Sequence, residues 1–348
     1  MDKRLDWADI ARGIGIILVV FGHTLVPGLR DAYTGVRFVW SFIYNIHMPV
    51  FFFVSGWLFE KGLAHHPNKG EVIAGKARLL MLPYIMFSLF AYAVIFVSMK
   101  IPALASILSG GDYGSPTVRD AVHGILFYSG HVDQHLWFVY SLFIVFTLNV
   151  LLGRVMKSKI MLVVLLMLYI SKALVIYPAI LNYTASDLLF FSLARAMYAN
   201  GRSAIVKKPI HLAIVVIVFV TSSVVYTYYD VSGIPNDAVR TAIYATRAVC
   251  SATGIVTVCT LSDMIAKTKL KPFFSVLGCY SYDIYLIHAP FLVSGLMGIL
   301  LAYSPLPPLI CCGAVTVTGI LLPYLISRYI IRKIPLLSLI LLGGAIRG

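Results

Sequence analysis

Ten long apolar runs, separated by short polar segments, constrain this chain more than any other feature of its sequence. A run of about 17–25 apolar residues is long enough to cross the hydrocarbon core of a bilayer as a helix. Only 12% of the residues are charged, whereas soluble domains carry about 25%. The sequence therefore excludes a water-soluble enzyme and predicts an all-α, polytopic integral membrane bundle. The ten predicted transmembrane helices are residues 10–27, 38–59, 82–99, 135–153, 160–177, 184–200, 209–228, 239–262, 279–302 and 307–328.

The basic residues alternate in register with these spans. With a cytoplasmic N-terminus, 19 of the 28 Lys and Arg residues lie on the inner side and 5 on the outer side. Cytoplasmic loops carry an excess of Lys and Arg, and a wrong number of spans would scramble this alternation. We therefore expect both termini to be cytoplasmic and the net charge of +14 to reflect topology rather than nucleic-acid binding. A retained first helix is favoured over a cleaved signal peptide, because acidic residues interrupt its basic start.

The first predicted span carries two ionisable residues, Arg12 and His23, within an apolar helix. An ionisable group in a span costs about 2.5–3.5 kcal/mol, so it needs a partner or a function. The two residues lie close to three helical turns apart, about 16–17 Å along the axis, and so share one face. Asp9 is expected to pair with Arg12 at i, i+3 spacing, and Gly13 leaves room for a neighbouring helix. The structural alternative is that Arg12 reaches inner headgroups while His23 forms a hydrogen bond within the bundle.

Polar residues also lie in the second, fourth and ninth spans. Pro49 is expected to kink the second helix and to free a backbone carbonyl. Arg195 and Arg247 lie inside the sixth and eighth spans. The candidate site residues of the second, fourth and ninth spans are Asn45, His47, Trp137, Asp283, Tyr285 and His288. Their structural alternative is hydrogen bonding or packing inside the bundle.

Three histidines, His23, His47 and His288, are enough for a metal site in principle. No carboxylate or cysteine accompanies them at a familiar ligand spacing, so we expect no bound metal. The five cysteines contain no C-x-x-C pair and indicate no disulfide framework.

The run from Arg12 to His23 (RGIGIILVVFGH) resembles the R-x10-H signature of the membrane acyltransferase-3 family. Four later segments resemble motifs of that family in the same order, at residues 47–56 (HMPVFFFVSG), 76–84 (KARLLMLPY), 135–139 (HLWFV) and 281–288 (SYDIYLIH). Each motif is weak alone, but five in order within a ten-span topology are specific. The first two are most similar to the fucose 4-O-acetylase-like branch. The sixth span departs from the pattern, because residues 190–195 lack an expected glycine.

The resemblance implies a single membrane domain over residues 1–348, with no separate soluble domain, in a bacterial cytoplasmic (inner) membrane. It implies O-acetyl transfer from cytoplasmic acetyl-CoA to a hydroxyl of a cell-surface polysaccharide, O-antigen or lipid-linked sugar on the outer side. The expected partners are thus acetyl-CoA, a carbohydrate or lipid-linked glycan acceptor and the lipid bilayer, without nucleic acid.

Roles follow from this expected reaction. Arg12, Lys76 and Arg78 are expected to bind the phosphates of acetyl-CoA, since cations at the inner face suit an anionic donor. For Lys76 and Arg78 the alternative is plain membrane topology. His23 is the expected general base or transient acyl carrier. The supporting catalytic residues are expected to be His288 and Tyr285, and the acceptor-binding residues His47, Asn45, Trp137 and Asp283.

A secondary transporter is the alternative function. Transporters also place ionisable residues and broken helices near the middle of the membrane. The sequence has no apparent inverted repeat or matched pair of interrupted helices, which favours the enzyme.

Overall fold

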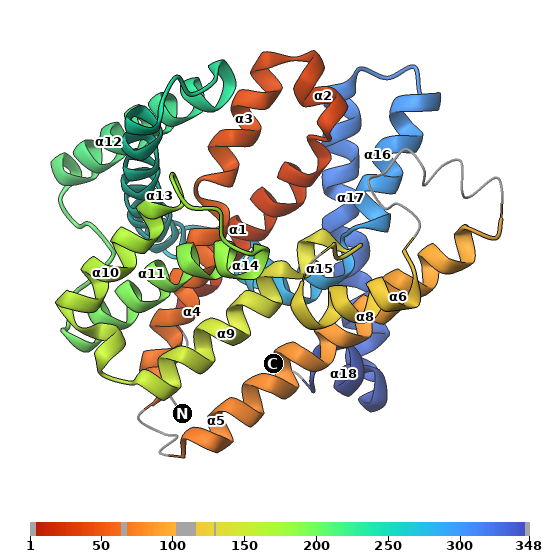
Figure 1. The fold of residues 1–348 in the computed structure, drawn as a ribbon, viewed down its shortest axis with the longest axis horizontal. Helices are drawn as coiled ribbons and strands as arrows, with labels where there is room; N and C mark the ends of the chain where they lie inside the picture. Colours follow the sequence, from red (N-terminus) through yellow and green to blue (C-terminus); the bar gives the residue numbers. More distant parts are fainter. Residues whose placement is uncertain (1–4, 64–67, 102–115, 129, 345–348) are drawn as a thin grey trace.

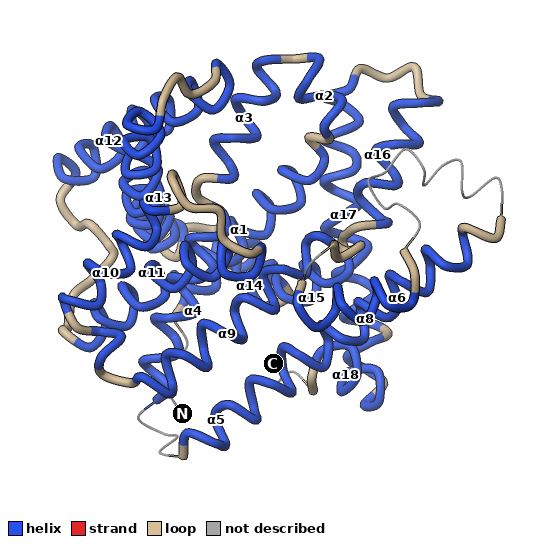
Figure 2. Tube along the Cα trace, viewed as in Figure 1, coloured by secondary structure: helices blue, strands red, loops and turns tan. Residues whose placement is uncertain are grey.

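The computed structural model describes residues 5–63, 68–101, 116–128 and 130–344, and every regular element within them is a helix (Figure 2). The helices are α1 (Asp6–Thr24), α2 (Pro27–Ala32), α3 (Thr34–Tyr44), α4 (His47–Leu63), α5 (Lys69–Lys76), α6 (Leu82–Ser98), α8 (Val118–Phe127), α9 (Trp137–Leu152), α10 (Lys159–Ser171), α11 (Ala179–Ala199), α12 (Pro209–Ser232), α13 (Asp237–Ile265), α14 (Lys271–Cys279), α15 (Ser281–Ile287), α16 (Phe291–Tyr303), α17 (Pro308–Tyr329) and α18 (Pro335–Leu342). A π-helical turn over Ala77–Met81 joins α5 to α6.

The predicted all-α, polytopic membrane fold is confirmed, and a helix or helix pair covers most of each predicted span. By length and composition, 7 helical segments of the described chain can cross a membrane, or up to 8 if the pair α15 and α16, bent by 57°, is one span. Helix α10, with 13 residues, is short for a crossing. Helix α11 is long enough, with 21 residues, but carries Asp187 and Arg195 among its buried residues. The number ten stays a prediction, as does the side on which the termini lie.

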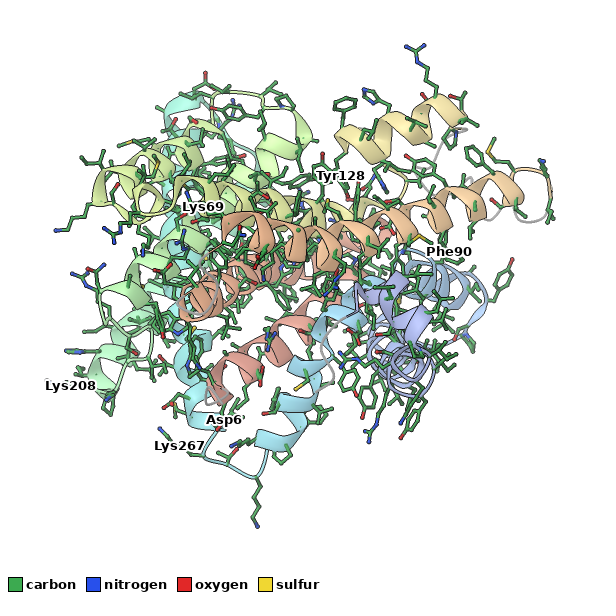
Figure 3. The ribbon with its side chains drawn as sticks, turned by 90° about the horizontal axis from the view of Figure 1, so that it is seen from below. Asp6, Lys69, Phe90, Tyr128, Lys208 and Lys267 are labelled. Carbon is green, nitrogen blue, oxygen red and sulfur yellow. The ribbon has the colours of Figure 1, made fainter. Side chains whose placement is uncertain are left out.

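Contacts between distant segments join loops that the charge pattern assigns to one side of the membrane. On the predicted inner side Lys271 pairs with Asp6 at 2.7 Å and Lys157 pairs with Glu60. Asp6 and Lys267 lie near each other at the lower edge of Figure 3. On the predicted outer side, the Arg37 guanidinium donates to the Asp230 carbonyl at 3.0 Å. The basic residues Lys3, Arg4 and Arg347 of the charge pattern lie outside the described residues.

The predicted second span is broken between α3 and α4, close to Pro49. A proline at this position has no N–H to donate to the carbonyl four residues earlier, which is that of Asn45. The Ser251 hydroxyl of α13 donates to this carbonyl at 2.7 Å and so replaces the missing bond. The predicted free carbonyl is therefore confirmed, and α3 and α4, interrupted at Asn45 and Ile46, together still form one segment from Thr34 to Leu63.

Glycines set the closest helix contacts, because each removes the side chain that would hold two backbones apart. A Cβ added to Gly13 of α1 would lie 2.3 Å from the Phe274 carbonyl oxygen of α14. A Cβ added to Gly56 of α4 would lie 2.3 Å from the Phe191 carbonyl oxygen of α11. Helix α1 thus lies against α14, and α4 against α11, near the centre of the bundle (Figure 1).

Candidate active site

Three imidazoles from separate parts of the chain meet at the C-terminal end of α1. His23 lies near the C-terminus of α1, His135 in the turn before α9, and His288 directly after α15. Their ring centroids are 4.8 Å (His23–His135), 5.1 Å (His23–His288) and 5.3 Å (His135–His288) apart. We call these three residues the histidine cluster. His47 does not belong to it, although the sequence grouped it with His23 and His288.

Hydrogen bonds fix the proton positions on two rings of the cluster. The Nδ1 atom of His288 lies 2.7 Å from the Tyr285 carbonyl oxygen and 3.1 Å from that of Ile284. The Nδ1 atom of His135 lies 2.9 Å from a carboxylate oxygen of Asp133. Since these oxygens accept hydrogen bonds, each Nδ1 carries the proton, and each Nε2 of a neutral ring presents a lone pair. Both Nε2 atoms are buried and have no hydrogen-bond partner within the described chain.

The carboxyl group of Asp133 lies just before the α9 span and is itself buried, with 2% of its residue surface exposed. Burial raises the pKa of this carboxyl from its usual 3.8 to about 7. The carboxylate orients His135 in the way that the aspartate of a Ser-His-Asp triad orients its histidine. Sequence reasoning missed this pair. The signal available was the D-x-H spacing at the start of the HLWFV segment.

A cavity of about 640 Å³ opens beside the histidine cluster. Five of the predicted site residues line it, and they are His23, Asn45, His47, Trp137 and Tyr285. The hydroxyl of Tyr285 donates to the backbone carbonyl of His135 and so ties α15 to the turn that carries the second imidazole. The side-chain amide of Asn45 is buried and has no hydrogen-bond partner within the described chain.

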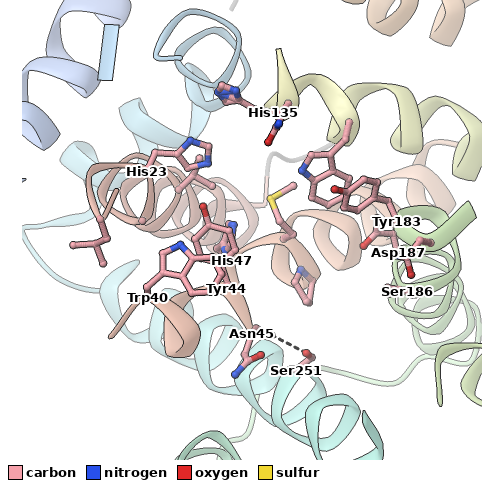
Figure 4. Close-up of a pocket in the computed structure, with 18 of the residues that line it drawn as sticks. His23, Trp40, Tyr44, Asn45, His47, His135, Tyr183, Ser186, Asp187 and Ser251 are labelled. Atoms are coloured by element: carbon pink, nitrogen blue, oxygen red, sulfur yellow. Dashed lines mark hydrogen bonds between the residues drawn. The ribbon is translucent and has the colours of Figure 1, made fainter. Parts of the chain in front are cut away.

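Aromatic pairs form two walls of the cavity. The rings of Trp40 and Tyr44 lie 4.2 Å apart, and those of Trp137 and Tyr183 stack at 4.4 Å. Figure 4 shows Trp40 and Tyr44 on one side, and Tyr183 beside Asp187 on the other. Flat apolar faces with polar edges suit a ring-shaped ligand that carries hydroxyl groups.

Five predicted site residues are not among those that line the cavity: His288 of the histidine cluster, Asp283, and the cations Arg12, Lys76 and Arg78. Asp283, expected to bind the acceptor, instead accepts hydrogen bonds from Ser327 and, at 2.7 Å, from Arg332. With only 1% of its surface exposed, it is a buried ion-pair partner that fixes α15 against the end of α17. Groups of the protein thus satisfy this carboxylate, and its expected contact with the acceptor stays a prediction.

The three predicted donor-binding cations also lie away from the cavity. Arg12 pairs with Asp9, as expected from their spacing. The ammonium of Lys76 lies 4.0 Å from the centroid of the Phe146 ring, and Arg78 is exposed. Their role in donor binding stays a prediction.

Arg195, the charged residue of the sixth predicted span, has a structural role. Its guanidinium donates to Glu60 at 2.8 Å and to the side-chain oxygen of Asn149 at 2.8 Å. Lys157 pairs with the same glutamate. This network joins α4, α9 and α11 at the predicted inner side, far along α4 from the cavity.

The nitrogens of the histidine cluster lie within 4.8 Å of one another, close enough for a metal ion to bridge them. The expectation of no metal was based on a different trio and stays a prediction. A site for a substrate hydroxyl group is a simpler interpretation of the histidine cluster than a metal site. Two fixed lone pairs without a donor form a site for a hydroxyl group, which has a proton to donate.

A comparison of the chain with models of protein families agrees with the order of the motifs in the sequence. The model of the acyltransferase-3 family, described as an acyltransferase domain, matches residues 5–328. No curated protein and no solved structure gives a match.

Proposed function

The chain belongs to the membrane acyltransferase-3 family, and from this premise we propose that it transfers an acetyl group from acetyl-CoA to a carbohydrate hydroxyl. That it is a membrane acyltransferase follows from the family and the apolar helices. The proposal adds three points. The donor is acetyl-CoA, the acceptor atom is a hydroxyl oxygen, and the acceptor lies on the outer side of a bacterial cytoplasmic membrane.

The proposal of a hydroxyl acceptor rests on one observation. The histidine cluster holds two buried imidazole nitrogens that can accept a hydrogen bond but have no donor within the described chain. A buried acceptor without a donor costs about 1–3 kcal/mol. A substrate hydroxyl bound between the rings supplies the missing donor, and the aromatic walls of the cavity suit its sugar ring.

In the proposed reaction, His23 takes the proton of the acceptor hydroxyl as the oxygen attacks the thioester carbon of acetyl-CoA. The C–S bond then breaks, His23 returns the proton to the CoA thiolate, and the acetyl ester stays on the acceptor. His288 lies beside this base, with ring centroids 5.1 Å apart, and helps to orient it. The unpartnered amide of Asn45 is the candidate donor to the developing oxyanion.

The donor would approach from the predicted inner side. Arg12 and His23 lie on one continuous helix, about 16–17 Å apart along its axis. Phosphates of CoA bound near Arg12, Lys76 and Arg78 would leave the pantetheine arm to reach toward His23. The pairing of Arg12 with Asp9 then sets the guanidinium in place for a phosphate.

The test is acetyl-CoA binding and CoA release by purified protein in nanodiscs, followed by label transfer from [acetyl-14C]CoA in inverted vesicles. We expect His23→Gln to bind acetyl-CoA but to transfer no label, and Arg12→Gln to bind it poorly. His211→Gln, a substitution at an exposed histidine of α12, is the matched control and should behave as wild type. Folded wild-type protein that neither binds acetyl-CoA nor releases CoA would refute the proposal.

A further inference from the structure

The cavity beside the histidine cluster carries more positive than negative charge. Its lining includes three side chains that are cationic at neutral pH, Arg30, Lys172 and Arg247, and one carboxylate, Asp187. They come from four separate parts of the chain: α2, the end of α10, the middle of α13 and α11. Charges in an apolar bundle are expensive and mark substrate pathways, so an excess inside one cavity needs an explanation.

Asp187 attracts Lys172 and Arg247 electrostatically, but one carboxylate does not balance three cations. Among the described residues, none of the three forms an ion pair, and Asp187 accepts its hydrogen bond from the Ser141 hydroxyl at 3.2 Å. The ammonium of Lys172 donates to the Ser186 hydroxyl at 2.5 Å. The excess positive charge is thus available to a ligand.

The two guanidinium groups rest on aromatic rings instead of carboxylates. Arg30 lies 4.2 Å from the centroid of the Trp40 ring, and Arg247 lies 5.2 Å from that of Tyr226. A guanidinium stacked in this way keeps its N–H groups free at the edge of the plane. The Nε atom of Arg30 is in fact buried without a hydrogen-bond partner in the described chain. Such groups match the oxygen atoms of a carboxylate or a phosphate, which accept paired N–H bonds.

The position of these cations argues for the acceptor rather than the acetyl donor. Arg30 follows the His23 end of α1, whereas Arg12 lies at the opposite end of that helix. The predicted donor-binding cations do not line the cavity. Arg30, Lys172 and Arg247 therefore line the same cavity as the aromatic pairs, on the side of His23 away from Arg12.

We propose that the acceptor is an anionic carbohydrate whose carboxylate or phosphate group binds Lys172 and Arg247, with Arg30 facing it from the opposite wall. The inference rests on the proposed acetyl transfer and adds the chemical class of its acceptor. The anion fixes the sugar between the aromatic walls so that one hydroxyl reaches the histidine cluster. A uronic acid and a sugar phosphate both offer this oxyanion chemistry.

The test uses three small probes on protein in nanodiscs: methyl β-D-glucuronide, α-D-glucose 1-phosphate and the neutral methyl β-D-glucoside. Binding is followed by thermal unfolding at several probe concentrations, since a ligand that binds only the folded state stabilises it. We expect both anions to bind more tightly than the glucoside, with an affinity that falls as salt rises. A preference between the anions identifies the carboxylate or the phosphate source.

The variants Lys172→Gln and Arg247→Gln should each weaken anion binding about tenfold or more, because each removes charge-assisted hydrogen bonds. Arg30→Gln repeats the test at a position outside the long helices, in case the first two variants unfold. Arg240→Gln is the matched control, since this arginine lies on the same helix as Arg247 but pairs with Asp237 at the surface. It should bind the anions as wild type does.

Three results would overturn the anionic acceptor. The first is that the glucoside binds as tightly as the anions. The second is that anion binding is unchanged in all three cavity variants. The third is that only Arg12→Gln loses anion binding, which would assign the anion to the donor site. Acetyl-CoA binding measured on the same samples separates the two proposals. If acetyl-CoA binds and CoA is released while the anion tests fail, only the acceptor class is wrong.

Discussion

Adding one methyl group at Gly278 tests whether α1 and α14 pack through their backbones. A Cβ at this position would lie 1.8 Å from the carbonyl oxygen of Asp9 and 2.6 Å from its carbon. Both atoms belong to the backbone, so no side chain can rotate away. An ordinary contact begins at about 3.4 Å, so the helices must separate by about 1.6 Å, a shift that rigid, well-packed cores resist.

We expect Gly278→Ala to destabilise the protein by about 1–3 kcal/mol or more, the range for overpacking a close-packed contact. The separation would also move Asp9, which pairs with Arg12, so acetyl-CoA binding should weaken together with stability. Both are measured in nanodiscs, by thermal unfolding and by equilibrium binding.

The control is Gly298→Ala in α16, where an added Cβ meets no atom within 4 Å. This change should be neutral or stabilising by up to about 1 kcal/mol, because alanine favours a helix over glycine. Wild-type stability of Gly278→Ala would refute the backbone contact between α1 and α14. Equal destabilisation by both substitutions would show that the effect is one of helix propensity rather than packing.

Three other predictions concern buried charges. Glu60→Gln should destabilise the protein by about 3–5 kcal/mol, because it leaves Arg195 buried without a counter-charge. In thermal unfolding, the double variant with Arg195→Met should recover part of the lost stability. A double variant as unstable as Glu60→Gln would contradict this role of the ion pair. Asp133→Asn should slow CoA release by about 10²–10⁴-fold through loss of the orientation of His135, whereas a rate within twofold of wild type would exclude the pair from the reaction. The pKa of Asp133 is raised from its usual 3.8 to about 7 in the folded protein, so the folded state binds the carboxyl proton more tightly than the unfolded state does. Stability should therefore fall as pH rises from 5 to 8. This pH dependence should weaken in Asp133→Asn, and an unchanged pH dependence would assign it to other groups.

The sequence by itself determined the properties that depend on one segment of chain. The cost of placing polar groups in hydrocarbon marks each apolar run as a helix, and the helical repeat aligns Arg12 with His23. The missing N–H of Pro49 predicts a free carbonyl at Asn45, which the structure contains. Each of these follows from residues no more than about three turns apart.

The segment before the third span shows where local reasoning was incomplete. Residues 71–82 mix apolar side chains with Lys76 and Arg78, a composition that also suits a helix lying along the membrane interface. In the structure they continue through a π-helical turn into α6, as one segment from Lys69 to Ser98. Contacts of α5 and of the π-helical turn with α9 hold this extension, and the sequence of the segment contains no sign of that neighbour.

Only the tertiary structure decided which polar residues share the site. His135 replaces His47 beside His23 and His288, and Asp133 stands behind it, from segments more than a hundred residues apart. Asp283 was expected at the cavity and lies in an ion pair with Arg332 instead. The physical reason is that nearly every face of these helices is apolar, so hydrophobic pattern does not specify which faces meet. Close approach at glycines and a few buried hydrogen bonds make that choice, and both depend on two segments at once.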